Sequence, residues 1–333
     1  MVVTGAAIAV TVVPPVRAVI EPEVTSPALL APSPVSTPID ATPRQAQADP
    51  AWARRWYRPI RGEWPTFLWV VGLHLAGLVG VILLPLPPWE AFAIAGALLF
   101  LGGLGTTVAF HRAMCHKSFT LHPIIEQALI ACAVANGSGN PENWVTMHRL
   151  HHRTSDRDDD ISSPHHGGFW WAHLRWLWQA PRPPGLVYAD MRQPRYLVWN
   201  RLQIPVLALS CFGGLGFLAV ADATTALAAC LWIGPLRLLW ALHTQCTVNS
   251  ICHLGSLRAE GGSSRNVAWL ALAHMGQGEN WHANHHEDQL HHRLGRRWWQ
   301  VDIGWWTIAG LAAVGLARDF RIDRRRPSVK ETP

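Results

Sequence analysis

Histidine is the residue type with the most chemical potential in this chain, with 18 copies among 333 residues. Two triplets share the spacing HxxHH: His148, His151 and His152, and His282, His285 and His286. Positions i, i+3 and i+4 of a helix lie on one face, so each triplet can aim three imidazoles at one small volume. Neutral imidazole is the commonest metal ligand in proteins. One triplet in a histidine-rich chain can be accidental, but two predict a metal site.

Two further pairs of residues can add ligands. His111 and His116 form an HxxxxH motif. At about 100° per residue, five helical steps separate the two rings, so they serve two metals or reach one metal across a distorted turn. Asn249 and His253 are four residues apart, on one face of one helix. Nine histidines are too many for one metal, and a two-metal site with open positions is expected for oxygen activation at non-haem iron.

The elements that must position these residues are apolar segments of membrane length. Only 15% of the residues are charged and 49% are apolar, which is typical of membrane proteins. We predict four membrane-spanning helices, at about residues 66–84, 91–110, 204–221 and 223–240. A short linker at 85–90 with three prolines and an abrupt turn at Asp222 join them as two antiparallel hairpins. The predicted fold class is therefore an all-α integral membrane protein.

Basic residues predict the orientation of these hairpins. Arginines precede the first span, Arg and Lys follow the second, and the two short linkers have none. By the positive-inside rule, both termini and the long segments after the second and fourth spans are cytoplasmic. We expect residues 111–203 and 241–303 to form a helical cytoplasmic cap that holds the di-metal site. The expected location is the plasma (inner) membrane.

The remaining parts of the chain predict no further active chemistry. We expect residues 1–50 to be a disordered leader rich in Pro and Ala, 51–320 to be the membrane domain and 321–333 to be a basic tail. The six cysteines contain no CxxC pair, which argues against a zinc knuckle or a disulfide framework. The net charge of +6 forms no single basic stripe, so no nucleic-acid partner is expected.

Several other histidines have plainer interpretations. Four lack a flanking partner motif and are interpreted as packed, hydrogen-bonded side chains: His74, His122, His243 and His274. Four lie in polar stretches and are expected to be solvated: His165, His166, His291 and His292. Arg237 lies near the end of the fourth span, where its stem is expected to snorkel to the interface.

The motifs together resemble those of the membrane fatty acyl desaturases, in particular the delta-9 acyl-CoA and acyl-lipid group. The similarity covers roughly Trp64 to Trp306. It rests on four segments, HRAMCH at 111–116, NWVTMHRLHHRTSD at 143–156, NSICHLG at 249–255 and GENWHANHH at 278–286.

The resemblance implies a set of metal ligands. Two irons of a non-haem di-iron centre would be ligated by His111, His116, His148, His151, His152, His253, His282, His285 and His286. Asn249 would hold a water on one iron, and Asp156 and Asp160 would orient ligand imidazoles by accepting from ring N–H groups. A bent hydrophobic tunnel would place an acyl carbon pair beside the metals. No catalytic residue beyond the metal centre is expected.

The implied activity is an O2-dependent desaturation that introduces a cis double bond, at the delta-9 position, into a saturated acyl chain. Electrons would come from an external donor, a ferredoxin-like or small haem protein with its reductase. The substrate is a fatty acyl thioester or a membrane lipid. Thr146 and Met147 stand where animal acyl-CoA enzymes have Arg and Asp, and Cys246 stands where the family commonly has Trp. The carrier therefore stays open between coenzyme A, acyl carrier protein and lipid.

Two alternatives remain. An acyl hydroxylase or acetylenase can use the same scaffold, because substrate placement selects the outcome at a reactive di-iron centre. A non-enzymatic metal-binding or haem-binding membrane protein is the other. Such proteins place ionisable ligands near the middle of the membrane, whereas these motifs lie at the predicted cytoplasmic ends of the spans.

Overall fold

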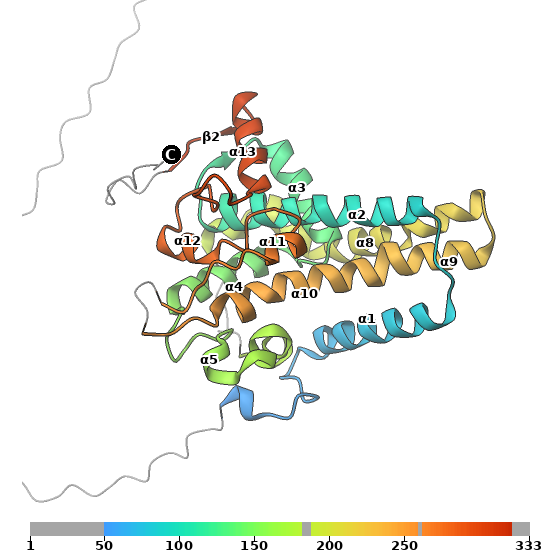
Figure 1. The fold of residues 1–333 in the computed structure, drawn as a ribbon, viewed down its shortest axis with the longest axis horizontal. Helices are drawn as coiled ribbons and strands as arrows, with labels where there is room; N and C mark the ends of the chain where they lie inside the picture. Colours follow the sequence, from blue (N-terminus) through green and yellow to red (C-terminus); the bar gives the residue numbers. More distant parts are fainter. Residues whose placement is uncertain (1–49, 182–187, 259–261, 322–333) are drawn as a thin grey trace, which may run out of the picture. The chain divides into compact units, whose positions relative to one another are not determined.

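The computed structural model describes residues 50–181, 188–258 and 262–321. The predicted leader, except Pro50, and the predicted basic tail, except Arg321, lie outside these residues. Within the described residues the chain is mostly helical, and its strands are two residues long each (Figure 1). The all-α prediction is confirmed.

In the part of the chain that the structure describes, four helices are long and apolar enough to cross a membrane, as predicted. The first is α1 (Trp64–Leu83), and the second joins α2 (Trp89–Leu104) to η2 (Gly105–Cys115). The third helix joins α7 (Pro194–Leu197), α8 (Trp199–Phe212) and η5 (Gly213–Ala219). The fourth joins α9 (Ala223–Leu231), η6 (Trp232–Leu236), α10 (Arg237–Ser250) and η7 (Ile251–His253). Figure 1 shows these helices side by side as one bundle.

The bundle exposes apolar side chains over its outer surface. In the most apolar stretch of each helix, only 17% of the first helix and 6% of the third is buried. Ile82 is 70% exposed and Leu209 is 77% exposed. Contiguous exposed apolar surface of this extent is unfavourable in water and favourable in lipid. The exposure therefore agrees with a membrane location for these helices.

The second and fourth helices run further than the predicted spans, to Cys115 and His253. Predicted spans end where polar residues begin, but packing satisfies the polar residues here. Arg237, inside the predicted fourth span, is satisfied in the same way, because it is 3% exposed and donates to the carbonyls of Ile233 and Ala135. The prediction that Arg237 snorkels to the interface is therefore wrong.

Short elements cover the histidine-bearing end of the bundle. Between the second and third helices lie α3 (Pro123–Ala135), α4 (Pro141–Thr154), α5 (Pro164–Gly167), η3 (Trp171–Arg175), α6 (Trp176–Gln179) and η4 (Ala189–Arg192). After the fourth helix come α11 (Leu270–Ala273), α12 (His282–Glu287) and α13 (Ile303–Ala313). A short η1 (Ala51–Ala53) precedes α1, and β1 (Thr120–Leu121) pairs antiparallel with β2 (Ala317–Arg318). Since α3, α4 and α13 all pack against η2, the segment Gly105–Cys115 lies at the centre of these elements.

Candidate metal centre

The end of the second helix is a π-helix rather than an α-helix. Over Gly105–Cys115 the backbone widens, and the His116 N–H donates to the carbonyl of His111, five residues earlier, at 3.1 Å. A π turn places residues i and i+5 one above the other. The rings of His111 and His116 consequently lie 4.9 Å apart between centroids. Of the two possibilities for HxxxxH, the structure has the distorted turn that lets both residues face one metal position.

The nine predicted ligands converge in two adjacent groups. In each group the candidate ligand atoms all lie within 4.8 Å of one another. The five-histidine group contains His111, His116, His148, His152 and His285. The four-histidine group contains His151, His253, His282 and His286. The two groups touch, since the rings of His152 and His286 have centroids 4.6 Å apart.

Each HxxHH motif divides its ligands between the two groups. His148 and His152 belong to one group and His151 to the other, and the second motif is divided in the opposite sense. On a helix, i+4 lies about 40° to one side of i, while i+3 lies about 60° to the other side. The rings of i+3 and i+4 therefore diverge. The expectation that one triplet shares one small volume is wrong, and the two motifs together build two sites.

The electrostatics of both groups fit metal ligands. Ring nitrogens of neighbouring histidines point at one another, for example His111 Nε2 and His285 Nε2 at 3.0 Å. Among the described residues, the buried Nε2 atoms of His116 and His151 have no hydrogen-bond partner. Burial, followed by the neighbouring imidazoles, lowers the pKa of His148 and His285 well below the ordinary value. Buried, neutral imidazoles with converging lone pairs are the form in which histidine binds a divalent metal.

A carboxylate lies behind one ligand of each group. His111 Nδ1 donates to Glu279 at 2.9 Å, and Thr107 also donates to that carboxylate. Burial raises the pKa of Glu279, but His111 and Arg112 outweigh it and lower the pKa to about 2. In the other group, His151 Nδ1 lies 3.4 Å from Asp160. Such partners fix the ring orientation and raise the basicity of the ligating nitrogen.

Asp156 reaches a histidine indirectly. Its carboxylate accepts from the backbone N–H of Ser263 at 2.8 Å, and the Ser263 hydroxyl lies 3.1 Å from His253 Nδ1. Asp160 therefore has the place predicted from sequence, against an imidazole, whereas Asp156 acts through the loop that carries Ser263. The positive φ of 65° at Asp156 marks the turn that directs it there.

Arg112 clamps the π turn to the segment that carries the second HxxHH motif. Its guanidinium pairs with both oxygens of Asp302, at 2.9 and 3.2 Å, and both side chains are 1% exposed. The same guanidinium donates to the carbonyls of Gln277 and His292. These residues flank α12, so the charge pair sets the position of α12 relative to His111.

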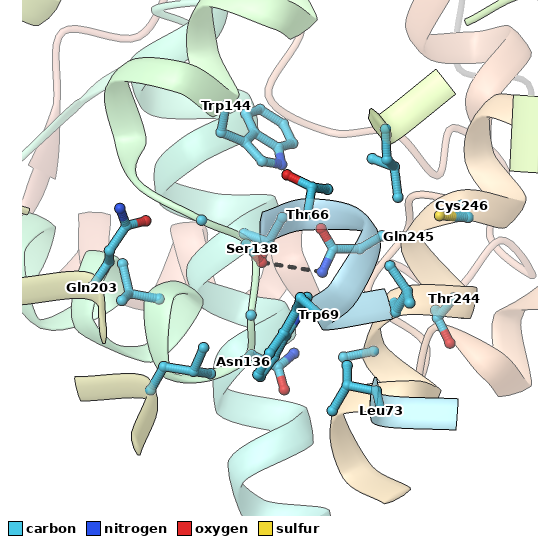
Figure 2. A pocket seen from close by; sticks show the side chains of 18 of the residues that line it. Thr66, Trp69, Leu73, Asn136, Ser138, Trp144, Gln203, Thr244, Gln245 and Cys246 are labelled. Atoms are coloured by element: carbon cyan, nitrogen blue, oxygen red, sulfur yellow. Dashed lines mark hydrogen bonds between the residues drawn. The ribbon is translucent and has the colours of Figure 1, made fainter. Parts of the chain in front are cut away.

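A cavity of about 1200 Å³ borders the histidine groups. His148, His151 and Asn249 line it together with apolar side chains from the membrane helices. Figure 2 shows this wall, formed by α1 (Thr66, Trp69, Leu73), α10 (Thr244, Gln245, Cys246) and the connection between α3 and α4 (Asn136, Ser138). Among the described lining residues there is no Lys or Arg. The cavity suits a long apolar ligand better than an anionic one.

The histidines interpreted as packed are all hydrogen-bonded, but the packing prediction is wrong for His122, which is exposed. His74 pairs with His243 at 3.1 Å, His274 Nε2 lies 3.1 Å from Thr247 Oγ1, and His122 caps α3. Of those predicted to be solvated, His165 is exposed, while His166, His291 and His292 are half-buried.

Three residues that support the site were not singled out from sequence: Glu279, Ser162 and Ser263. A signal existed for Glu279, which lies three residues before His282 within the GENWHANHH segment. Ser162 Oγ lies 3.2 Å from His151 Nδ1, and Ser263 lies beside His253. Both serines are in loops without periodicity, so no sequence signal points to them.

Comparison with known proteins agrees with this geometry. Residues 87–318 match the sequence profile of the family described as fatty acid desaturase. This chain belongs to the fatty acid desaturase family. It is accordingly an oxidoreductase, a membrane desaturase of the delta-9-like group. The non-enzymatic alternative is thereby ruled out.

Several characterised relatives act on lipid-bound acyl chains, according to their names. Delta-9 acyl-lipid desaturase 1 of Arabidopsis thaliana is 34% identical over 251 residues, 70% of this chain and 76% of the relative. The sn-1 stearoyl-lipid 9-desaturase of Anabaena variabilis is 32% identical over 280 residues, 78% of this chain and 94% of the relative. The chloroplastic palmitoyl-monogalactosyldiacylglycerol delta-7 desaturase of Arabidopsis thaliana is 32% identical over 285 residues, 81% of this chain and 71% of the relative.

Proposed function

We propose that this desaturase introduces a cis double bond at the delta-9 position of a lipid-bound saturated acyl chain, with dioxygen as oxidant. The two histidine groups would each hold one iron, with Asn249 binding a water on one of them. The observation that carries the proposal is the meeting of two groups of converging imidazoles with a cavity of about 1200 Å³ lined largely by apolar side chains. Bound iron would supply the oxidising power that an unactivated C–H bond requires.

The side chains of the protein would position the substrate rather than react with it. A methylene group carries no charge for a general acid or base to act on, so geometry selects the carbon. The cavity wall, from Leu73 of α1 to Cys246 of α10, holds the acyl chain and excludes water. Glu279 and Asp160 keep two ligand rings in place, and both carboxylates are outside the direct ligand set.

A lipid carrier is favoured over coenzyme A by two features. The described lining of the cavity contains no cationic side chain, whereas the nucleotide of coenzyme A carries several phosphates. Thr146 and Met147 precede His148 where acyl-CoA enzymes have a charged pair. The names of two relatives, an acyl-lipid and a stearoyl-lipid desaturase, support the same carrier.

We further propose that the histidine-bearing end of the bundle and both termini are cytoplasmic, in the plasma (inner) membrane. Basic residues on both sides of the first hairpin support this orientation. The electrons for dioxygen reduction would come from a separate ferredoxin-like or small haem protein with its reductase. Basic residues at this end of the protein, such as the exposed Arg297, would attract an acidic donor.

Expression in cells that make only saturated lipids tests the proposal. Mass spectrometry of each lipid class should reveal one new double bond between carbons 9 and 10, in intact lipids. Hydroxylated or acetylenic products would instead show that the protein catalyses one of the alternative reactions. Metal analysis of the purified protein should give about two irons per chain. A lipid profile with no new oxidised product would refute the proposed function.

A further inference from the structure

The large cavity beside the histidine groups, which we call the cleft, has two walls that also face the surroundings of the bundle. One wall is α1, where Leu68, Trp69 and Gly72 line the cleft although each is exposed. The other wall is α8, where Ile204 and Phe212 line it with exposed fractions of 66% and 60%. Residues that line a cavity and are exposed at the same time mark its opening. The cleft therefore has an open side.

The open side lies between two helices that share a neighbour. α1 packs against α9, η6 and α10 of the fourth membrane helix, and α8 packs against α9 and η6 from another direction. Over their described lengths, α1 and α8 pack little against each other. The fourth helix supplies the floor between them, where Leu231 and Cys246 are buried and line the cleft. The cleft consequently opens sideways, toward the lipid around α1 and α8.

The two ends of the cleft differ in polarity. Both walls begin on the side of the short elements, since α1 contacts α6 and the third membrane helix contacts α4. At this end the lining contains Gln203 and Thr66, which donates to Glu63 at 2.7 Å (Figure 2). At the opposite end it contains Phe212 and Leu227. This gradient matches a lipid whose polar part lies at the first end and whose chain points to the second.

The length of the cleft matches one leaflet of a bilayer. Along α1 the lining runs from Thr66 to Ala76, and along α8 it runs from Gln203 to Phe212. At 1.5 Å per residue both walls are about 14–15 Å long, which is half of the roughly 30 Å hydrocarbon core of a membrane. A lipid tail fills such a length while its head group stays at the interface.

We propose that the acyl chain of an intact membrane lipid enters the cleft sideways from the bilayer, between α1 and α8, while its head group stays outside, near Thr66 and Gln203. The inference rests on the proposed function and gives the route of its substrate. Lipid is the ligand that reaches an opening at this depth, because a coenzyme A thioester would have to bring its phosphates into hydrocarbon. A chain in the cleft reaches His148 and Asn249, which line it too.

Gly72 of α1 is the position at which the cleft can be closed. It lines the cleft, and a Cβ added there meets no atom within 4 Å. Gly72→Ala and Gly72→Phe therefore fill the opening in two steps, without a clash at the backbone. The matched controls are Gly96→Ala and Gly96→Phe on α2, since Gly96 has the same free space and lies outside the described lining of the cleft.

The first measurement needs neither iron nor activity. The full chain in phosphatidylcholine nanodiscs receives phosphatidylcholine with a diazirine near the methyl end of one saturated chain, and mass spectrometry locates the label after irradiation. The marker is label on Cys246, which is 4% exposed and lines the cleft, so lipid on the outer surface does not reach it.

The label on Cys246 should decrease with the size of the side chain at position 72. Gly72→Ala should lower it slightly and Gly72→Phe by about 10-fold or more, because a filled cavity excludes the chain. Both Gly96 variants should label like the wild-type chain. Equal labelling of Cys246 in the wild-type chain and Gly72→Phe, or no label on Cys246 in the wild-type chain, would overturn the proposal.

The second measurement separates sideways entry from entry at the histidine-bearing end. The same photoreactive chain is carried by phosphatidylcholine, by a phosphatidylethanolamine with a polyethylene glycol head group, or by coenzyme A. Sideways entry predicts that the two lipids label Cys246 to within about 2-fold, because the chain buries the same apolar surface from either one. The thioester should label it less. Loss of label with the polymer head group, or stronger label from the thioester, would overturn the proposal.

Desaturation assays with donor and dioxygen keep the route apart from the proposed function. If the iron-loaded wild-type protein forms no double bond while Cys246 is labelled as expected, the proposed function fails and the sideways route stands. If double bonds form in the wild-type chain, Gly72→Phe should slow their formation and Gly96→Phe should not. A wild-type rate in Gly72→Phe would overturn the route and leave the proposed function intact.

Discussion

The two metal groups and a hydrogen-bonded histidine chain, formed by His74, His243 and His173, use one residue type in two opposite arrangements. In the five-histidine and four-histidine groups, ring nitrogens converge within 4.8 Å and several have no partner. In the histidine chain neighbouring rings meet through single nitrogen contacts, and both ends bind oxygen atoms. Converging lone pairs require a cation with several coordination positions, whereas a line of single contacts requires only protons. The arrangement of partners, rather than the count of histidines, separates a candidate metal site from a set of hydrogen-bonded histidines.

The largest effect is expected from removing a ligand that joins several others. His285 Nε2 lies 2.9 Å from His152 Nε2 and 3.0 Å from His111 Nε2. His285→Ala or His148→Ala should lower desaturation by more than about 100-fold and reduce the iron content, because loss of a ligand exceeds the 10–100-fold cost of losing an outer partner. Membrane insertion should be unaffected. His166→Ala is the control, and full activity in either ligand variant would contradict the assignment.

The next largest effect concerns the buried charge pair that holds α12. Asp302→Asn removes the nearer counter-ion of the fully buried Arg112 and leaves only Glu279, 3.8 Å away. Removing one partner of a buried pair costs about 3–5 kcal/mol, so the melting temperature in detergent should fall sharply. The control is Arg296→Gln, which breaks a pair with the exposed Glu287 and should cost less than about 1 kcal/mol. Equal losses in the two variants would show that Arg112 does not clamp the site.

A smaller effect is expected from the carboxylate behind His111. Glu279→Gln keeps the shape of the side chain but removes the charge that orients the ring and raises its basicity. Iron affinity or activity should drop by about 10–100-fold, while the melting temperature of the metal-free protein changes little. Asp160→Asn makes the same change at His151, where the contact is longer, so its effect should be smaller. The reverse order would mean that the four-histidine group limits the reaction.

The smallest effect is expected from a change in pH. The folded chain keeps His116, His148, His152, His282 and His285 neutral, because burial lowers each pKa well below 6.5. His286 has its pKa lowered to about 3. The unfolded chain binds protons as pH falls through about 6.5 and the folded chain does not, so stability decreases below that pH. Thermal unfolding of the metal-free protein between pH 8 and 4.5 measures this, and a flat profile would contradict neutral ligands.

The same pH series sharpens the contrast between the two regions. Bound metal should protect the protein down to a lower pH, because protons must displace iron before the ligand imidazoles can charge. The histidine chain should not respond to iron, since it has no converging nitrogens. If NMR signals of the imidazole rings showed that both regions titrate over the same pH range, the distinction between metal ligands and hydrogen-bonded histidines would not hold.

Sequence alone determined much of this protein. Hydropathy and length predicted four spanning helices, because each apolar segment matches a membrane thickness by itself. Motif spacing picked out nine histidines that converge in the structure, and the i, i+3, i+4 geometry that positions them is local to each helix. The resemblance to desaturases, carried by four short motifs, led to the family that residues 87–318 match.

Tertiary structure decided how those residues combine. The π turn at His111 and the division of each HxxHH motif between two groups depend on packing around η2. His111 meets a residue 174 positions away, and the partners of the histidine chain are up to 169 apart. Periodicity carries no information about such contacts, because they depend on how helices approach one another rather than on how each one forms.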